Sequence, residues 1–136
     1  GRLPQAVGNA AEQGDEAALL AWLDSGGRVN ATCGEGAVSG ITALMTTAGN
    51  GHERLVELLL QHGAEVNLQS SNGLTALMLA AYQGYERVVD LLLRHGAEVD
   101  LQESDGHTAL TAAARGYERV VDLLLRHGTE VDLQDG

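Results

Sequence analysis

Histidine is the side chain best suited to acid–base or metal chemistry near neutral pH, and three of the five histidines in this chain are regularly spaced. His62, His95 and His127 each precede a glycine, and they are separated by 33 and 32 positions. This spacing predicts one structural position that is copied three times, at helix C-termini, where a positive charge opposes the helix dipole. Side chains one repeat apart are too distant to share a metal ion. We therefore expect these three histidines to be structural.

The other reactive side chains do not form a convergent set. Cys33 is the only cysteine, which excludes an internal disulfide and a thiolate-rich zinc site and favours an intracellular, cytoplasmic protein. The acidic residues form no Asp-x-Asp calcium loop, and no phosphate-binding glycine loop precedes a helix. Catalysis requires a nucleophile, a general base or a metal in convergent geometry. We therefore expect a protein that is not an enzyme, without cofactor or bound metal.

Charge restricts the class of partner. Nineteen Asp and Glu residues stand against eight Arg and no Lys, which gives a net charge of −11. Such a field repels phosphate backbones and anionic lipids, so neither nucleic acid nor a membrane is an expected partner. A protein or peptide with a basic face would be steered toward the chain. The longest apolar runs are far below the roughly 20 residues that span a bilayer, which predicts a soluble protein.

Internal repetition organises the chain. The thirteen residues GYERVVDLLLRHG occur at Gly84–Gly96 and again at Gly116–Gly128. Self-similarity at this period indicates a repeat architecture. Alignment on the glycines extends the repetition to four units within a single domain, residues 1–136, and the units are approximately residues 3–34, 39–71, 72–104 and 105–136.

Each unit has the pattern of a short helix, a glycine turn, a longer helix and an extended hairpin. Thr75 can cap a first helix through its hydroxyl group, and the small residues after it allow close packing between helices. Val88, Val89 and Leu92 belong to a wide apolar stripe on the second helix. Gly96 supplies the left-handed residue that ends this helix.

The segment NGLTALMLAA, followed by GYERVVDLLLRHGAEVD, resembles the ankyrin repeat. The resemblance covers essentially the whole chain and implies an all-α solenoid of helix-turn-helix pairs joined by β-hairpin loops. It also implies a convex back formed by the second helices and a concave groove formed by hairpin tips and first helices. The family's Thr-Pro-Leu-His motif reads TALM, TALM and TALT here, so Met45, Met78 and Thr111 occupy its histidine position.

Two asparagines carry a further implication of this resemblance. Asn30 and Asn67 stand in the contexts RVN and EVN. We expect them to stabilise the hairpins through side-chain hydrogen bonds. Hydroxylation by an asparaginyl hydroxylase, as is known for such residues in the family, is the alternative.

Two length changes interrupt the period. Val29 to Val66 spans 37 positions, and the surplus falls in NATCGEGAVSG, which predicts an enlarged hairpin loop near Cys33. In the last unit AAYQG becomes AARG. We place this deletion in the turn between the two helices, because a deletion within a helix would rotate its apolar face by about 100°.

The units differ mainly on the groove side. GYERVVDLLLRHGAEVDLQ and its copy in the last unit differ at one of nineteen positions, whereas the stretches before them differ at many. This contrast favours a constant scaffold with a diversified groove that binds a protein or peptide. The expected partner-binding residues are Ile41, Asn50, Leu74, Met78, Tyr82, Gln83, His107, Thr111 and Arg115.

Different roles are expected within this set. Ile41 and Leu74 should project outward from hairpins, and Leu74 and Tyr82 should be apolar anchors. His107 and Arg115 would be polar specificity contacts. The alternative for Met78, as for Met45 in the preceding unit, is burial between repeats.

Two other functions are compatible with the sequence. The last unit repeats the apolar VVDLLL pattern without a polar cap, which is compatible with self-association into a homo-oligomer or with array building. An engineered binder on an ankyrin scaffold is the other alternative, since such proteins vary the same face.

Overall fold

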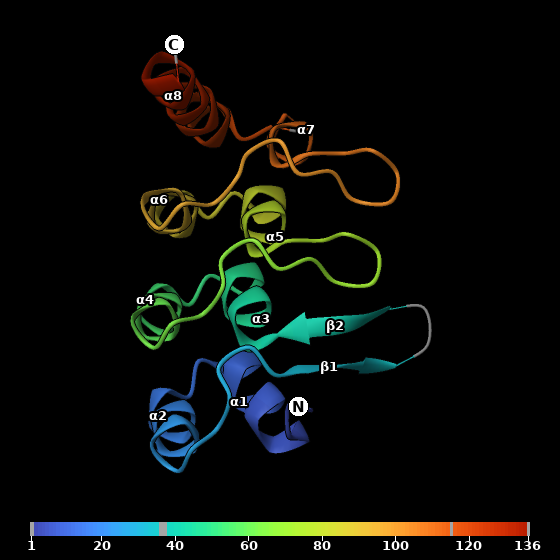
Figure 1. The fold of residues 1–136 in the computed structure, drawn as a ribbon, viewed down its shortest axis with the longest axis vertical. Coiled ribbons are helices and arrows are strands. Elements are labelled where there is room, and N and C mark those ends of the chain that lie inside the picture. Colours follow the sequence, from blue (N-terminus) through green and yellow to red (C-terminus); the bar gives the residue numbers. More distant parts are fainter. Residues whose placement is uncertain (1, 36–37, 115, 136) are drawn as a thin grey trace.

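The chain forms a stack of four helix pairs (Figure 1). The structure is a computed structural model that describes residues 2–35, 38–114 and 116–135, with the backbone alone for Glu35 and residues 129–135. The first helices are α1 (Gln5–Gln13), α3 (Ala43–Gly49), α5 (Ala76–Gln83) and α7 (Ala109–Ala113). The second helices are α2 (Glu16–Asp24), α4 (Glu53–Gln61), α6 (Glu86–Arg94) and α8 (Glu118–Asp135). Across these described ranges, no helix is both long and apolar enough to cross a membrane.

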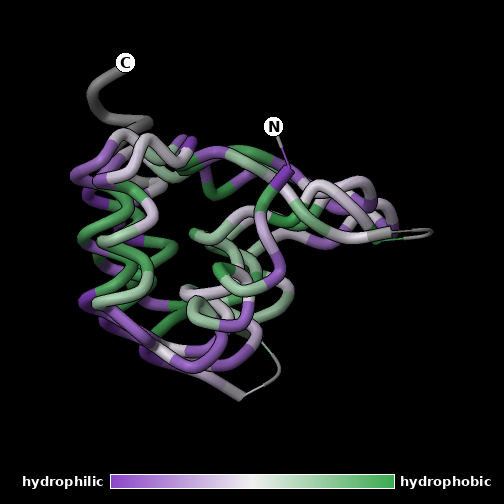
Figure 2. The backbone as a smooth tube through the Cα atoms, turned by 90° about the horizontal axis from the view of Figure 1, so that it is seen from below, coloured by the Kyte–Doolittle hydropathy of each residue, from purple (hydrophilic) through white to green (hydrophobic). Residues whose placement is uncertain are grey.

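The helices form two layers, and the connecting loops extend from the inner layer. The first helices lie in the middle, the second helices on one side and the loops on the other (Figure 1). The view along the stack shows the same order, with the loops directed away from the second helices (Figure 2). This arrangement confirms the expected all-α solenoid, with the second helices forming one face and the first helices and loops the other.

The core lies between the two helix layers and continues from pair to pair. Leu77 of α5 and Val88 and Leu92 of α6 are at most 1% exposed. In the last pair Val120 and Leu124 are likewise buried, at positions that correspond to Val88 and Leu92. The apolar face of α8 therefore keeps its register, as expected if the deletion lies in the turn before it. The turn residue Arg115, at which we placed the deletion, lies outside the described residues.

Threonine hydroxyls begin the first helices of the last three pairs. Thr42, Thr75 and Thr108 accept hydrogen bonds from the backbone N–H groups three residues later, at 3.2, 3.2 and 3.3 Å. Each hydroxyl satisfies one of the amides that lack a partner at a helix N-terminus. The predicted cap at Thr75 is thus confirmed.

A left-handed glycine follows the second helix of each inner pair. An asparagine of the preceding unit forms hydrogen bonds with the backbone next to it. Gly96 has φ = +91° after α6. Asn67 Nδ2 donates to the Gly96 carbonyl at 3.1 Å, and the Glu98 amide donates to Asn67 Oδ1 at 2.8 Å. Asn30 similarly accepts from the Glu65 amide at 2.9 Å. The expected structural role of both asparagines is confirmed.

The expected helix end at Gly128 is wrong, because α8 continues through this glycine to Asp135. His127 therefore lies within α8 and not at its C-terminus, where it was expected. Asp100 stands where the preceding unit has Asn67. A carboxylate can accept an amide hydrogen but has no N–H to donate to the Gly128 carbonyl. The side-chain bridge at Gly96 therefore cannot form in full at Gly128. This difference does not by itself explain the longer helix, because α4 ends before Gly63 with Asn30 described only as an acceptor.

The enlarged loop near Cys33 is a two-stranded antiparallel sheet. Strand β1 (Thr32–Glu35) pairs with β2 (Val38–Thr42), and Cys33 lies opposite Ile41. The register shifts between Cys33 and Glu35, where Gly34 has φ = +110°. The surplus residues thus fall in this hairpin, the loop in which the described residues form paired strands (Figure 1).

Histidines and ion pairs support the back of the stack. His62 and His95 place Nδ1 at 2.8 and 2.9 Å from the carbonyls of Leu58 and Leu91, in the last turns of their helices. Their predicted structural role is confirmed. On the outer surface Arg54 pairs with Glu16 of the preceding unit at 2.9 Å. This hydrogen bond, with the charge of Glu16, raises the pKa of Arg54. Such exposed pairs stabilise proteins little.

Candidate partner-binding hollow between the third and fourth helix pairs

A hollow of about 500 Å³ lies on the groove side between α5 and α7. Below it is called the groove hollow. Its walls come from both first helices and from the loops that precede them. The lining residues are Leu74, Met78, Leu79, Tyr82, Glu103, His107, Thr108, Thr111 and Ala112.

Local sequence differences explain why the hollow opens here. An apolar residue just before an N-cap commonly packs against the fourth helical residue, an arrangement called a hydrophobic staple. In the third unit these two positions hold Leu74 and Leu79. In the fourth unit they hold His107 and Ala112. Because the small Ala112 leaves space unfilled, the surface between α5 and α7 is concave.

The interior of the groove hollow is apolar and its edge carries an aromatic ring. Met78 is 4% exposed and belongs to the core, so it forms the floor. Tyr82 is 47% exposed on the last turn of α5, which ends at Gly84 with φ = +77°. An apolar wall with an exposed tyrosine at its edge is suited to hold an apolar side chain of a partner.

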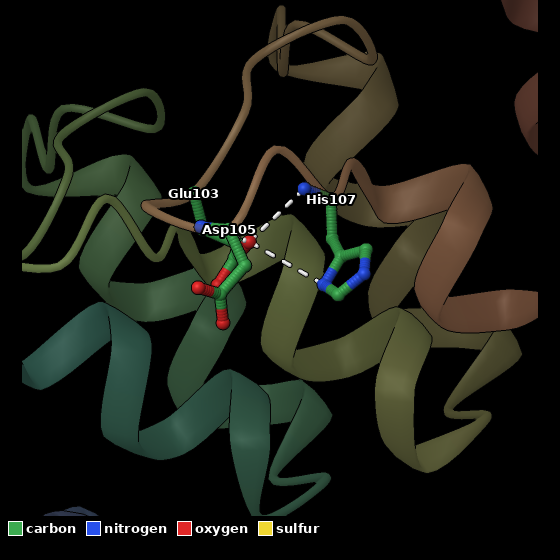
Figure 3. Close-up of side chains that lie close together, drawn as sticks. All are labelled: Glu103, Asp105 and His107. Atoms are coloured by element: carbon green, nitrogen blue, oxygen red, sulfur yellow. Dashed lines mark hydrogen bonds and ion pairs between the residues drawn. The ribbon is translucent and has the colours of Figure 1, made fainter.

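The polar edge of the groove hollow is a tight turn before α7 (Figure 3). Glu103 Oε1 accepts hydrogen bonds from the amides of Asp105 at 2.7 Å and His107 at 3.0 Å. His107 Nδ1 lies 3.4 Å from the same oxygen. Thr111 and Thr108 form a reciprocal capping box at the start of α7. The edge therefore presents an ordered carboxylate, an imidazole and two hydroxyl groups.

The structure brings together five of the nine predicted binding residues: Leu74, Met78, Tyr82, His107 and Thr111. Three others lie outside the groove hollow, namely Ile41 in β2, Asn50 at the C-terminus of α3 and Gln83 at the end of α5. Asn50 Nδ2 donates to the Thr46 carbonyl at 2.7 Å and thus supports its own helix end. Arg115 lies outside the described residues.

Two expected orientations need correction. Ile41 and Leu74 do not project freely, because both are partly buried and pack against the core. Each directly precedes an N-capping threonine, a position from which a side chain turns back onto the helix. Leu74 therefore forms a wall of the groove hollow, and its expected outward projection is wrong; its role as an apolar anchor stays a prediction. Met45 and Met78 are 1% and 4% exposed. They are therefore buried in the core, which was the alternative expected for them.

Comparison of the units did not select Glu103, which lines the groove hollow, or Val38, which is an exposed apolar residue. Glu103 replaces Ser70 of the preceding unit, and a comparison of the two loops that began before these residues would have shown the change. Val38 is 45% exposed on β2, in the inserted hairpin, where no other unit offers a residue for comparison.

The stacked helix pairs and their groove define a repeat solenoid. A family model described as ankyrin repeats (3 copies) matches residues 7–103 and 63–135. These overlapping matches cover nearly the whole chain, which belongs to the ankyrin repeat family. The family model describes three repeats, whereas the described residues form four helix pairs. No curated protein gives a significant match. Ankyrin repeats generally mediate protein–protein contacts and are typically non-catalytic.

Proposed function

We propose that this chain binds a protein or peptide partner along its concave face, with the groove hollow as the principal contact. The observation that carries the proposal is the apolar hollow of about 500 Å³ beside the half-exposed Tyr82. A contiguous apolar recess with an aromatic edge has the composition of an interaction hot spot. The walls belong to helices that are packed into the core, so little conformational entropy is lost when a partner orders against them.

Charge indicates the chemistry of this partner. Glu103 and Asp105 lie at the polar edge of the groove hollow, and the chain carries a net charge of −11. A peptide that combines a large apolar side chain with a nearby Arg or Lys would place the first in the groove hollow and the second beside these carboxylates. Electrostatic steering would also raise its association rate, and this effect would weaken with added salt.

The proposal is tested by selecting peptides from a random display library on the folded protein. Affinities of the selected peptides are then measured by fluorescence polarisation for the original chain and for Tyr82→Ala. We expect Tyr82→Ala to weaken binding by about tenfold or more, as is typical of an aromatic hot spot. The expected peptide consensus contains an apolar residue and a basic residue.

Arg87→Ala provides the matched control, because the Arg87 side chain is 84% exposed on the convex back. Binding should be the same for this variant as for the original chain. Equal affinity of the peptides for the Tyr82→Ala variant would refute the proposed site, and so would an equal loss in both variants.

Self-association is a second candidate function, supported by the outer face of the last helix pair. Leu125 of α8 is 53% exposed, beside a shallow hollow of about 210 Å³ that Val99, Leu110 and Leu124 also line. A second copy could bury this apolar surface. Light scattering over a concentration series should then show a mass increase that Leu125→Glu abolishes, whereas a constant monomer mass would exclude this function.

A further inference from the structure

Three side chains of different chemistry meet at the tip of the loop before α7. Donor atoms of Glu103, Asp105 and His107 all lie within 4.8 Å of one another (Figure 3). The set contains one imidazole nitrogen and two carboxylate groups. This combination suits Zn²⁺ and similar divalent transition ions, whereas Mg²⁺ and Ca²⁺ prefer oxygen ligands alone.

The three side chains are close enough to approach one ion. With metal–ligand bonds of about 2.0–2.1 Å, two ligands of a tetrahedral site are about 3.3 Å apart, and the donor atoms of this set lie within 4.8 Å of one another. Glu103 Oε1, which is 3.4 Å from His107 Nδ1, already accepts two amide hydrogen bonds, so Oε2 would be the ligand. Asp105 is exposed, and rotation of its side chain can bring a carboxylate oxygen closer without disturbing the core.

The backbone holds the two closer ligands in place. The Glu103 amide donates to the His107 carbonyl at 2.9 Å, and the Gly106 amide donates to the Glu103 carbonyl at 2.8 Å. Glu103 Oε1 also accepts the amides of Asp105 and His107. A carboxylate offers two oxygens and about four lone-pair positions. Glu103 can therefore keep these hydrogen bonds and still coordinate a cation.

The preceding unit contains the same turn without these ligands. Ser70, Asn72 and Leu74 occupy the corresponding positions. The Ser70 amide donates to the Leu74 carbonyl at 2.9 Å, and the Gly73 amide donates to the Ser70 carbonyl at 2.9 Å. The Ser70 hydroxyl accepts the Leu74 amide at 3.1 Å, as Glu103 Oε1 accepts the His107 amide. The turn thus forms with a neutral acceptor at this position. The two carboxylates and the imidazole are specific to the fourth unit.

We propose that Glu103, Asp105 and His107 bind one divalent transition ion of the Zn²⁺ type. Three protein ligands leave a fourth coordination position for water or for a donor atom of another molecule. Glu103 and His107 also line the groove hollow, so the ion would lie next to it. Binding of the ion itself does not depend on the proposed partner.

Isothermal titration calorimetry of the whole chain with ZnCl₂ in a non-chelating buffer tests this proposal. We expect saturable binding of one equivalent that an excess of MgCl₂ does not suppress. The triple substitution Glu103→Ser, Asp105→Asn and His107→Leu transfers the turn of the third unit and should abolish this binding. Circular dichroism and thermal unfolding verify that the variant is folded.

Two single variants locate the ion. Asp105→Asn changes only an exposed side chain, and it should weaken binding by more than about tenfold, since even residues that only support metal ligands are worth roughly 10–100-fold in affinity. His95→Gln removes an exposed histidine in another unit and should leave the affinity unchanged. The proposal is overturned if the original chain shows no saturable binding. It is also overturned if the triple variant binds Zn²⁺ as well as the original chain, which would indicate non-specific attraction to the acidic surface.

Discussion

The ring of Tyr117 lies so close to Gly84 of the preceding unit that a Cβ atom on Gly84 would be 2.4 Å from Tyr117 Cδ1. Real Cβ atoms do not approach other atoms this closely. The same relationship recurs along the stack, in the pairs Tyr85–Gly51 and His52–Gly14. The first copy of the string GYERVVDLLLRHG therefore contains both halves of one contact: Gly84 receives the Tyr117 ring of the next unit, and Tyr85 covers Gly51 of the previous unit.

Gly84→Ala should destabilise the protein for two physical reasons. Gly84 has φ = +77°, and a non-glycine residue held in such a conformation costs on the order of 1–3 kcal/mol. The added methyl group must also displace the Tyr117 ring. We expect the free energy of unfolding, measured in urea, to fall by more than the backbone term alone.

Gly96→Ala is the matched control for the ring contact. Gly96 has φ = +91°, but a Cβ atom there would meet nothing within 4 Å. Gly96→Ala should lower the free energy of unfolding only by the cost of holding alanine in the left-handed conformation. If both substitutions lower the free energy of unfolding equally, the contact between Tyr117 and Gly84 contributes nothing to stability.

Asn67→Asp removes one hydrogen bond, the one that Asn67 Nδ2 donates to the Gly96 carbonyl after α6. The carboxylate can still accept from the Glu98 amide, but it cannot donate to the Gly96 carbonyl. We expect the free energy of unfolding to fall by about 1 kcal/mol, the typical net value of one hydrogen bond. Chemical denaturation measures this change.

Asn30→Asp is the control for that experiment. Asn30 is described only as an acceptor, from the Glu65 amide at 2.9 Å, and an aspartate keeps this function. The loss of stability should therefore be clearly smaller. A loss equal to that of Asn67→Asp would show that introduced charge, and not the missing donor, is responsible.

The fold could be predicted from the sequence because the repeats carry several independent signals in register. Thr75 before a run of small residues predicted a helix start, and Gly96 predicted a helix end; both predictions are confirmed. The predicted helix end at Gly128 was wrong because the repeated string is the same in both units while its surroundings differ. One such difference is Asp100 in place of Asn67, since only the amide can donate a hydrogen bond.

The site was harder to predict because it depends on side-chain direction and on empty space. Variation between units pointed to Tyr82, His107 and Thr111, which the structure places around one hollow; their role in binding stays a prediction. It gave no information on orientation, so Leu74 was expected to be exposed although it packs against the core. The groove hollow itself results from a small residue, Ala112, and the absence of atoms leaves little trace in a residue pattern.

Ala112→Leu tests the groove hollow without removing any polar group. Leucine at this position copies the third unit, where Leu79 stands four residues after the N-cap, and it has a high helix propensity. The larger side chain should fill the groove hollow and abolish binding of peptides selected on the original chain, as measured by fluorescence polarisation. Zn²⁺ binding at the adjacent turn should be unchanged, because this substitution leaves its ligands in place. Ala114→Leu adds the same volume at an exposed position outside the lining and should leave peptide affinity unaltered. Undiminished peptide binding by Ala112→Leu would show that the partner contacts another surface.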